Sequence, residues 1–252
     1  MNTRALRRMA LDIDERHRAG MRDLPERLHE LHFGSTARRL DASRRRFLTR
    51  AAAGGAVVAV GGVVLPVAGF VPLAGAQAEE EVTLPEADLE LATFAASVEH
   101  AAVAAYGAAA ERRLIEEPYL QLALLFAQHH KDHAGAFEAL IAAEEPIAPN
   151  ATLLEAFAPQ IEAATDQTEL LTIAFTIEQA AASTYQLAMG VLESADAAAA
   201  VATIEPIEAQ HAVVWGSALE LPIDGDDTDP DNWMPAFESS DQALSPDDYP
   251  VA

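Results

Sequence analysis

The stretch SVEHAAVAAY, residues 97–106, sets Glu99 and Tyr106 seven residues apart in a run that is otherwise small and mostly apolar. The stretch TIEQAAASTY, residues 176–185, repeats this spacing with the same two residue types. Seven residues are close to two turns of an α-helix, so the glutamate and the tyrosine of each stretch share one face. We interpret the two stretches as matching helices of an internal repeat.

Each stretch is followed by a second polar segment at nearly the same distance. The segment HKDH, residues 130–133, follows the first stretch, and the segment EAQH, residues 208–211, follows the second. The separation of Glu99 from His133 matches that of Glu178 from His211 to within a single position. Turn residues lie between a stretch and its segment, so each pair predicts an antiparallel helical hairpin. Within such a hairpin, the polar residues lie at equal distances from the turn and therefore at one level.

Start and stop signals predict four helices, over residues 86–113, 118–144, 166–193 and 197–220. Thr83 and Glu86 form a predicted capping box, Asp166 is the predicted cap of the third helix, and Pro206 is expected to interrupt the fourth. The link over residues 146–165 is long enough to cross the length of a bundle, in part as a short helix. The predicted fold is all-α, a ferritin-like four-helix bundle of two antiparallel hairpins joined by a long crossover.

Six polar side chains fall at one level on the otherwise apolar faces of this bundle: Glu99, His130, His133, Glu178, Glu208 and His211. An ionised carboxylate in an apolar core costs several kcal/mol unless a positive charge compensates it. Divalent cations would supply this charge, and a mixture of imidazole and carboxylate suits iron, manganese or zinc. We therefore expect the six residues to be metal ligands.

One glutamate from each of two helices, with Glu-x-x-His from each of the other two, is the ligand pattern of ferritin-like dimetal proteins. Residues 86–220 resemble this superfamily, and specifically its exported ferritin-like domain proteins. The resemblance implies binding of iron or manganese and chemistry with oxygen or peroxide. One position departs from the pattern, because His130 stands where a second Glu-x-x-His would have its glutamate. Because this carboxylate is missing, the site could hold one ion instead of two. The metal could be zinc as well as iron or manganese.

Several neighbours of these residues have supporting roles in the prediction. Tyr106 and Tyr185 are expected to hydrogen-bond ligand carboxylates rather than to carry electrons. His129 directly precedes the HKDH segment and is an alternative ligand or a support for one. We expect Trp215 to pack in the core and His100 to lie at the surface or beside the site.

Charge divides the chain into two parts. Residues 1–78 hold 13 Arg and 7 Asp or Glu, a balance of +6, whereas residues 79–252 hold 3 Lys or Arg and 33 Asp or Glu, a balance of −30. So acidic a domain repels nucleic acid, which we exclude as a partner. The chain has no cysteine, which excludes disulfides and thiolate metal sites.

The segment SRRRFL, residues 43–48, resembles the twin-arginine (Tat) export signal, S/T-R-R-x-F-L. It precedes a long uncharged run, residues 51–78, which ends in the cleavable sequence AQA. Glycines and a proline in this run argue against a membrane anchor, which remains the alternative. The predicted organisation is an N-terminal extension 1–42, a signal peptide 43–78, a four-helix bundle 79–220 and an acidic irregular tail 221–252.

The sequence thus predicts a protein exported across the cytoplasmic membrane, with a mono- or dinuclear iron or manganese centre that reacts with oxygen or peroxide. If it is an enzyme, it is a di-metal oxidoreductase. The alternative is a non-catalytic envelope stress or interaction bundle with a vestigial or structural metal site. The expected partners are metal ions and the Tat machinery. A homodimer is an alternative to a monomer.

Overall fold

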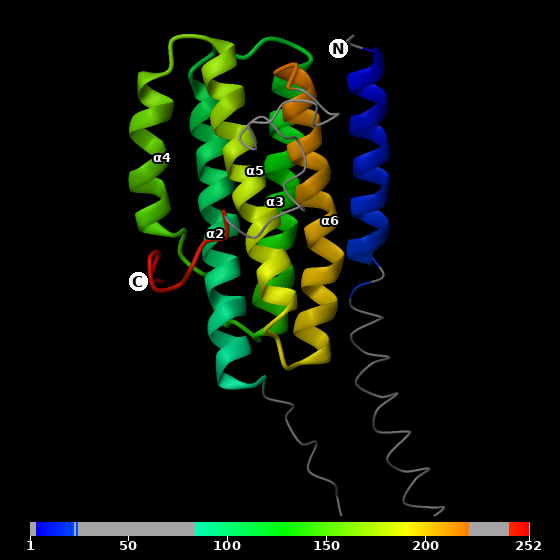
Figure 1. The fold of residues 1–252 in the computed structure, drawn as a ribbon, viewed down its shortest axis with the longest axis vertical. Coiled ribbons are helices and arrows are strands. Elements are labelled where there is room, and N and C mark those ends of the chain that lie inside the picture. Colours follow the sequence, from blue (N-terminus) through cyan, green and yellow to red (C-terminus); the bar gives the residue numbers. More distant parts are fainter. Residues whose placement is uncertain (1–3, 23, 25–83, 222–241, 252) are drawn as a thin grey trace, which may run out of the picture. The chain divides into compact units, whose positions relative to one another are not determined.

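The computed structural model describes residues 4–22, 24, 84–221 and 242–251, and every regular element among them is helical (Figure 1). The elements are α2 (Glu86–Glu111), α3 (Tyr119–Leu140), α4 (Ala151–Ala163), α5 (Gln167–Met189) and α6 (Ala195–Ala218), preceded by a helix over residues 4–22. The helices pack in pairs, α2 with α3 and α5 with α6, and this ferritin-like bundle confirms the predicted fold. None of the described helices is long and apolar enough to cross a membrane.

The crossover between the two hairpins contains the short helix α4, which packs on α2 and α5 (Figure 1). Asn150 begins this helix, because its side chain accepts a hydrogen bond from the amide of Leu153 at 3.1 Å. The amide of Asn150 donates in turn to the carbonyl of Ser97 on α2, at 2.9 Å. The crossover is therefore tied to the bundle at the start of α4.

The predicted helix boundaries hold with three corrections. Asp166 caps α5 as expected, since its carboxylate accepts from the amide of Glu169 at 3.0 Å. The capping residue of α2 is Pro85, without a side-chain hydrogen bond, and Thr83 lies outside the described residues. The second and third helices end at Leu140 and Met189, short of their predicted ends at residues 144 and 193. The fourth helix is not interrupted, because packing of α6 in the bundle holds it helical through Pro206, which lacks only its own amide donor.

Each hairpin contacts the turn of the other hairpin through a side chain in its own first helical turn. The buried carboxylate of Asp88, in the first turn of α2, accepts from the amides of Glu193 and Ser194 at the α5–α6 turn. The side chain of Gln167, in the first turn of α5, accepts from the amide of Glu116 at the α2–α3 turn, at 2.8 Å. These reciprocal contacts hold the two hairpins at a fixed height relative to each other.

The helix over residues 4–22 packs against the bundle. Leu6 and Ile13 belong to one buried apolar cluster and Leu24 to another. A Cβ atom at Gly20 would lie 3.0 Å from the side chain of Thr203 on α6, so the two backbones approach closely. The described part of the predicted N-terminal extension therefore covers one side of the bundle.

Candidate metal centre

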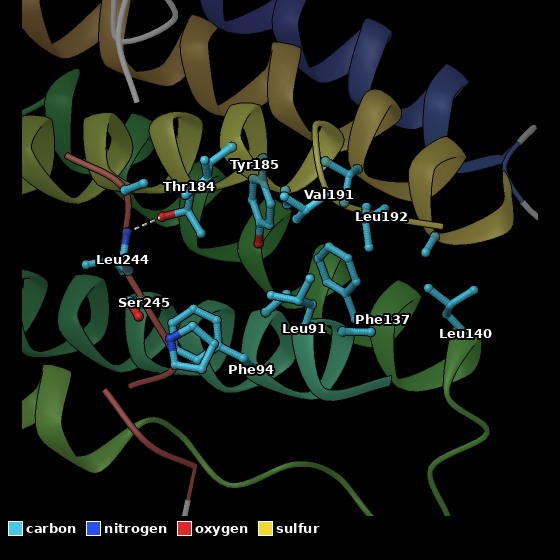
Figure 2. A pocket seen from close by; sticks show the side chains of 18 residues that line it. Leu91, Phe94, Phe137, Leu140, Thr184, Tyr185, Val191, Leu192, Leu244 and Ser245 are labelled. Carbon is cyan, nitrogen blue, oxygen red and sulfur yellow. Dashed lines mark hydrogen bonds between the residues drawn. The ribbon is translucent and has the colours of Figure 1, made fainter. Parts of the chain in front are cut away.

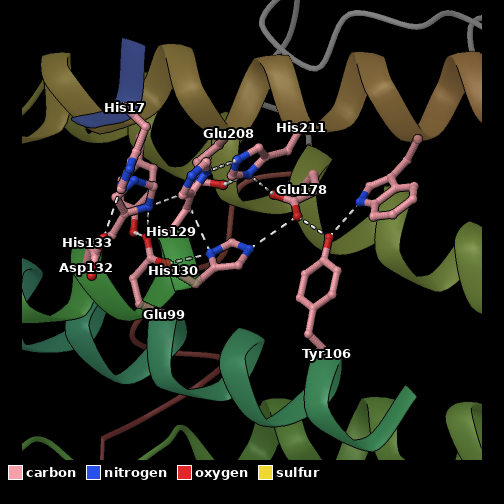
Figure 3. A network of polar contacts seen from close by, with 12 residues as sticks. His17, Glu99, Tyr106, His129, His130, Asp132, His133, Glu178, Glu208 and His211 are labelled. Carbon is pink, nitrogen blue, oxygen red and sulfur yellow. Dashed lines mark hydrogen bonds and ion pairs between the residues drawn. The ribbon is translucent and has the colours of Figure 1, made fainter. Parts of the chain in front are cut away.

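The structure brings the six expected ligands into one buried cluster that draws on four helices (Figure 3). Their ligand atoms form two overlapping groups, each with all atoms within 4.8 Å of one another. One group is Glu99, His130, His133 and Glu208, and the other is His130, Glu178, Glu208 and His211. All six side chains are at most 1 % exposed.

Two residues belong to both groups. The ring nitrogens of His130 face opposite sides, with Nδ1 2.7 Å from Glu99 and Nε2 3.2 Å from Glu178. The carboxylate oxygens of Glu208 are divided in the same way, with Oε1 2.6 Å from His133 and Oε2 3.1 Å from His211. His130 and Glu208 therefore form the middle of the cluster.

One buried nitrogen of the cluster has no polar partner. Nε2 of His133 has no hydrogen-bond partner among the described residues, whereas its Nδ1 pairs with Oε1 of Glu208 at 2.6 Å. Buried polar groups are almost always satisfied, so this nitrogen is an exception within the cluster. The mixed oxygen and nitrogen donors of the six residues suit iron, manganese or zinc. The residues therefore fit a metal.

Electrostatics shift the inner histidines toward their charged form. Burial alone would lower the pKa of His133, but the carboxylates of Glu208 and Glu99 outweigh it and raise this pKa to about 9. The pKa of His130 is raised well above its usual range, because three glutamates outweigh burial. The pKa of His211 is also raised, mainly by Glu178 against the effect of burial. Without metal, protons on imidazole thus take the place of the cation.

The glutamates show the complementary shifts. Burial would raise the pKa of Glu99, but His130 and His133 outweigh it and lower this pKa to about 2. The pKa of Glu178 lies well below its usual range, because His130 and His211 outweigh burial in the same way. These two carboxylates are therefore ready to bind a cation at neutral pH.

Each tyrosine of the repeat donates a hydrogen bond to the glutamate of the other hairpin. The hydroxyl of Tyr106 donates to Glu178, and that of Tyr185 donates to Glu99. Burial, together with the nearby carboxylates, raises the pKa of both tyrosines well above 10, so they stay protonated donors. Trp215, expected only to pack, donates from its indole nitrogen to the hydroxyl of Tyr106 at 2.7 Å. This contact was missed because spacing along α6 does not show what the indole faces.

His129 lies outside both groups of candidate ligands and contacts one of these candidates, His211. Its Nδ1 is 3.0 Å from Nε2 of His211, and its Nε2 is 3.5 Å from the carboxylate of Asp14 on the N-terminal helix. The ring of His17 stacks on that of His129, with centroids 3.8 Å apart (Figure 3). His100 pairs with Glu138 at 2.8 Å, away from the cluster.

These outer histidines differ from the inner ones in charge. Burial and the nearby histidines lower the pKa of His17 to about 3, and they lower that of His129 as well. Sequence reasoning missed His17 and Asp14, which lie far before the cluster in the chain. The spacing of Leu6, Ile13, His17 and Leu24 was the available signal, because it is the stripe of a helix with one buried face.

The comparisons agree with this geometry. The sequence model of a family described as "Ferritin-like domain" matches residues 87–221, more than half of the chain. The chain belongs to this ferritin-like domain family. No curated protein and no solved structure matches it. The matched region covers the four helices of the bundle except the first residue of α2, and it contains all six residues of the cluster.

Proposed function

We propose that this ferritin-like protein binds a mono- or dinuclear iron or manganese centre through Glu99, His130, His133, Glu178, Glu208 and His211. The observation that carries the proposal is the pair of buried four-residue groups that share His130 and Glu208. The site contains three carboxylates and three imidazoles from four helices. Burial of ionisable groups is costly, and a bundle core of apolar residues would be stable without them. Nε2 of His133, which has no hydrogen-bond partner among the described residues, supports the same conclusion.

The two shared residues determine how many ions the site takes. The two oxygens of Glu208 face His133 and His211, so this carboxylate would help to hold one ion or two. A neutral imidazole has only one free lone pair, so His130 binds one ion and donates its other N–H to a carboxylate. The second ion would then have fewer ligands than the first. The site would therefore hold one ion more tightly than a second.

The metal would supply electron transfer to oxygen or peroxide when it is bound. The residues of the chain orient the ligands for it. Tyr106 and Tyr185 each fix one oxygen of a glutamate, which leaves the other oxygens for the ion. His129 holds the far nitrogen of His211. The four helices bury the cluster, so bulk water does not compete with the ligands.

Metal content measures this proposal directly. We expect one to two iron or manganese ions per chain by elemental analysis of protein purified without chelators, and loss of these ions in Glu178→Ala/His211→Ala. The matched control is His100→Ala/Glu138→Ala, which removes a histidine–glutamate pair of the same bundle outside the cluster. Metal-free wild-type protein after incubation with iron, manganese and zinc would refute the proposal.

One observation favours a second candidate, a non-catalytic bundle with a structural or vestigial site. The raised pKa values of His130, His133 and His211 allow three imidazolium ions to balance three carboxylates without metal. Under this candidate, the protein binds metal without reacting with oxygen, or binds none. Oxygen consumption by the iron-loaded chain separates the two functions.

We also propose export by the twin-arginine route, on the resemblance of residues 43–48 to its signal; these residues lie outside the described part. This route carries folded proteins, and the segment before such a signal stays on the cytoplasmic side. The helix over residues 4–22 contacts the bundle, so under this proposal the contact belongs to the stage before translocation. Export should stop in Arg44→Lys/Arg45→Lys, with Arg38→Lys/Arg39→Lys as the control. Equal export of both variants would contradict the proposal.

A further inference from the structure

An apolar pocket, with Tyr185 in its lining, opens between the helices and the tail (Figure 2). Its volume of about 140 Å³ is bounded by α2, α3, α5, α6 and tail residues 243–246. Leu187 and Val191 line it and are 48 % and 56 % exposed, so the pocket reaches the surface. The volume is close to that of an engineered apolar cavity of about 150 Å³ that takes up benzene.

The lining of the pocket offers a ligand almost no polar partner. None of the lining residues is charged. The hydroxyl of Thr184 donates to a carbonyl one turn earlier in α5 and accepts from the amide of Leu244 at 2.8 Å. Tyr185 directs its hydroxyl to Glu99, and the hydroxyl of Ser245 accepts from the amide two residues later. A charged or strongly polar ligand would lose its hydration here without compensation.

Tyr185 connects the pocket with the metal cluster. Its ring lines the pocket, while its hydroxyl donates to the carboxylate of Glu99. Ala95, which also lines the pocket, precedes Glu99 by one helical turn. A molecule in the pocket therefore contacts a side chain that hydrogen-bonds a proposed ligand carboxylate.

The tail forms one wall of the pocket. Besides the bond between Leu244 and Thr184, the carbonyl of Tyr249 accepts from the side chain of Asn150 at 2.9 Å. Leu244 and Tyr249 also pack on an apolar cluster that contains Phe94. The wall is therefore fixed at both ends of the segment, and the pocket does not depend on a freely moving tail.

We propose that this pocket binds a small apolar organic molecule, of the size of one aromatic ring or a short alkyl chain, and presents it to the metal centre across Tyr185. Binding depends on the pocket alone, whereas presentation rests on the proposed metal centre. The apolar lining selects the chemical class, and the volume limits the size.

Benzene is the probe, added to the metal-free full-length chain and followed by NMR of isoleucine, leucine and valine methyl groups. We expect saturable shifts for Val191, Leu192 and Leu244. Ala188→Phe places a ring in the pocket and should weaken benzene binding at least tenfold. Ala108→Phe adds the same ring on the exposed face of α2 and should leave the affinity unchanged. Shifts that never saturate, or that persist in Ala188→Phe, would overturn the proposal.

A second variant covers the case in which Ala188→Phe does not fold. Leu244→Ala enlarges the pocket and should bind naphthalene at least tenfold more tightly than the wild-type chain does; equal affinity counts against the pocket. A further arm uses Co²⁺ in place of the native metal and follows its visible spectrum. Saturating benzene should shift that spectrum, and benzene that binds without a shift would overturn presentation to the metal. If Co²⁺ does not bind at all, the metal proposal fails while the methyl shifts still decide the pocket.

Discussion

Nδ1 of His130 lies 3.6 Å from Oε1 of Glu208, and the two residues hold the same position in the two halves of the repeat. Each comes three residues before a cluster histidine, His133 in one half and His211 in the other. The bundle is thus nearly symmetric in its backbone and asymmetric in its charge. The pairing of an imidazole with a carboxylate at these two positions keeps three acids balanced by three bases.

Replacement of His130 by glutamate tests this balance. His130→Glu restores the second Glu-x-x-His but leaves four buried carboxylates with two imidazoles. We expect the metal-free variant to lose about 3–5 kcal/mol of unfolding free energy at pH 7, the range for breaking a buried ion pair. Two divalent ions should restore the stability. Urea denaturation with and without metal measures both effects.

Leu124→Glu is the matched control, because it adds one carboxylate to the half-exposed face of the same helix. It should change stability by less than about 0.5 kcal/mol, as surface substitutions usually do. If His130→Glu is as stable as this control without metal, His130 does not balance the carboxylates in the way proposed.

The two tyrosines should differ in their contributions to stability. Each phenylalanine variant removes a hydrogen bond to a buried carboxylate, a loss of about 1.5–3 kcal/mol. Tyr106→Phe also leaves the indole N–H of Trp215 without its acceptor, so it should destabilise more than Tyr185→Phe. Denaturation of both variants in chelator measures the difference.

A double-mutant cycle isolates the cause of that difference. Trp215→Phe combined with Tyr106→Phe should be less destabilising than the sum of the single changes, since the two side chains share one hydrogen bond. The combination with Tyr185→Phe should be additive. Additivity in both pairs would mean that the indole contact adds nothing to the stability of the site.

The sequence predicts the fold well because the repeat carries most of it. The spacing of Glu99 and Tyr106, repeated at Glu178 and Tyr185, is enough to pair the helices and to place the polar residues at one level. Asp166 marks a helix start correctly because its side chain acts on an amide in the first turn of the same helix. The interruption expected at Pro206 does not occur, because tertiary packing overrides the local preference of proline.

Contacts between segments far apart in the chain could not be read from the same patterns. The stacking of His17 on His129 depends on how the N-terminal helix packs on the bundle, and no local spacing encodes that. The pocket behind Tyr185 likewise needs the tail residue Leu244 as a wall. The sequence identifies the candidate ligands, whereas their neighbours follow only from the tertiary structure.

The stability of the metal-free protein should depend on pH in two windows. The pKa of His133 rises from an ordinary value of 6.5 to about 9, so its contribution is complete below pH 6.5 and is lost as the pH rises through 9. The pKa of Glu99 falls from 4.5 to about 2, so its contribution is complete above pH 4.5 and is lost as the pH falls through 2. We expect maximal stability between these windows, measured by urea denaturation in chelator.

Metal binding should show the opposite dependence on alkaline pH. Protons on His133 and its neighbours must leave before a cation binds, so metal affinity should increase as the pH rises from 7 to 9. His100→Ala leaves the cluster intact and should keep the whole profile. An affinity that does not change over this range would show that the inner histidines are not protonated without metal.

Docking of the N-terminal helix should protect it from proteolysis. Gly20→Leu introduces a side chain where a Cβ would already lie 3.0 Å from Thr203, so it should release the helix from the bundle. Trypsin should then cleave after Arg16 and Arg18 at least tenfold faster, because a docked helix must open before it fits a protease. Mass spectrometry of timed digests measures the rate. Leu11→Ala changes a side chain that is 70 % exposed on the same helix and should leave the rate unchanged. Cleavage of the wild-type chain as fast as that of a freely accessible helix, and equal to that of Gly20→Leu, would mean that the helix does not stay on the bundle in solution and does not hold His17 and Asp14 beside the cluster.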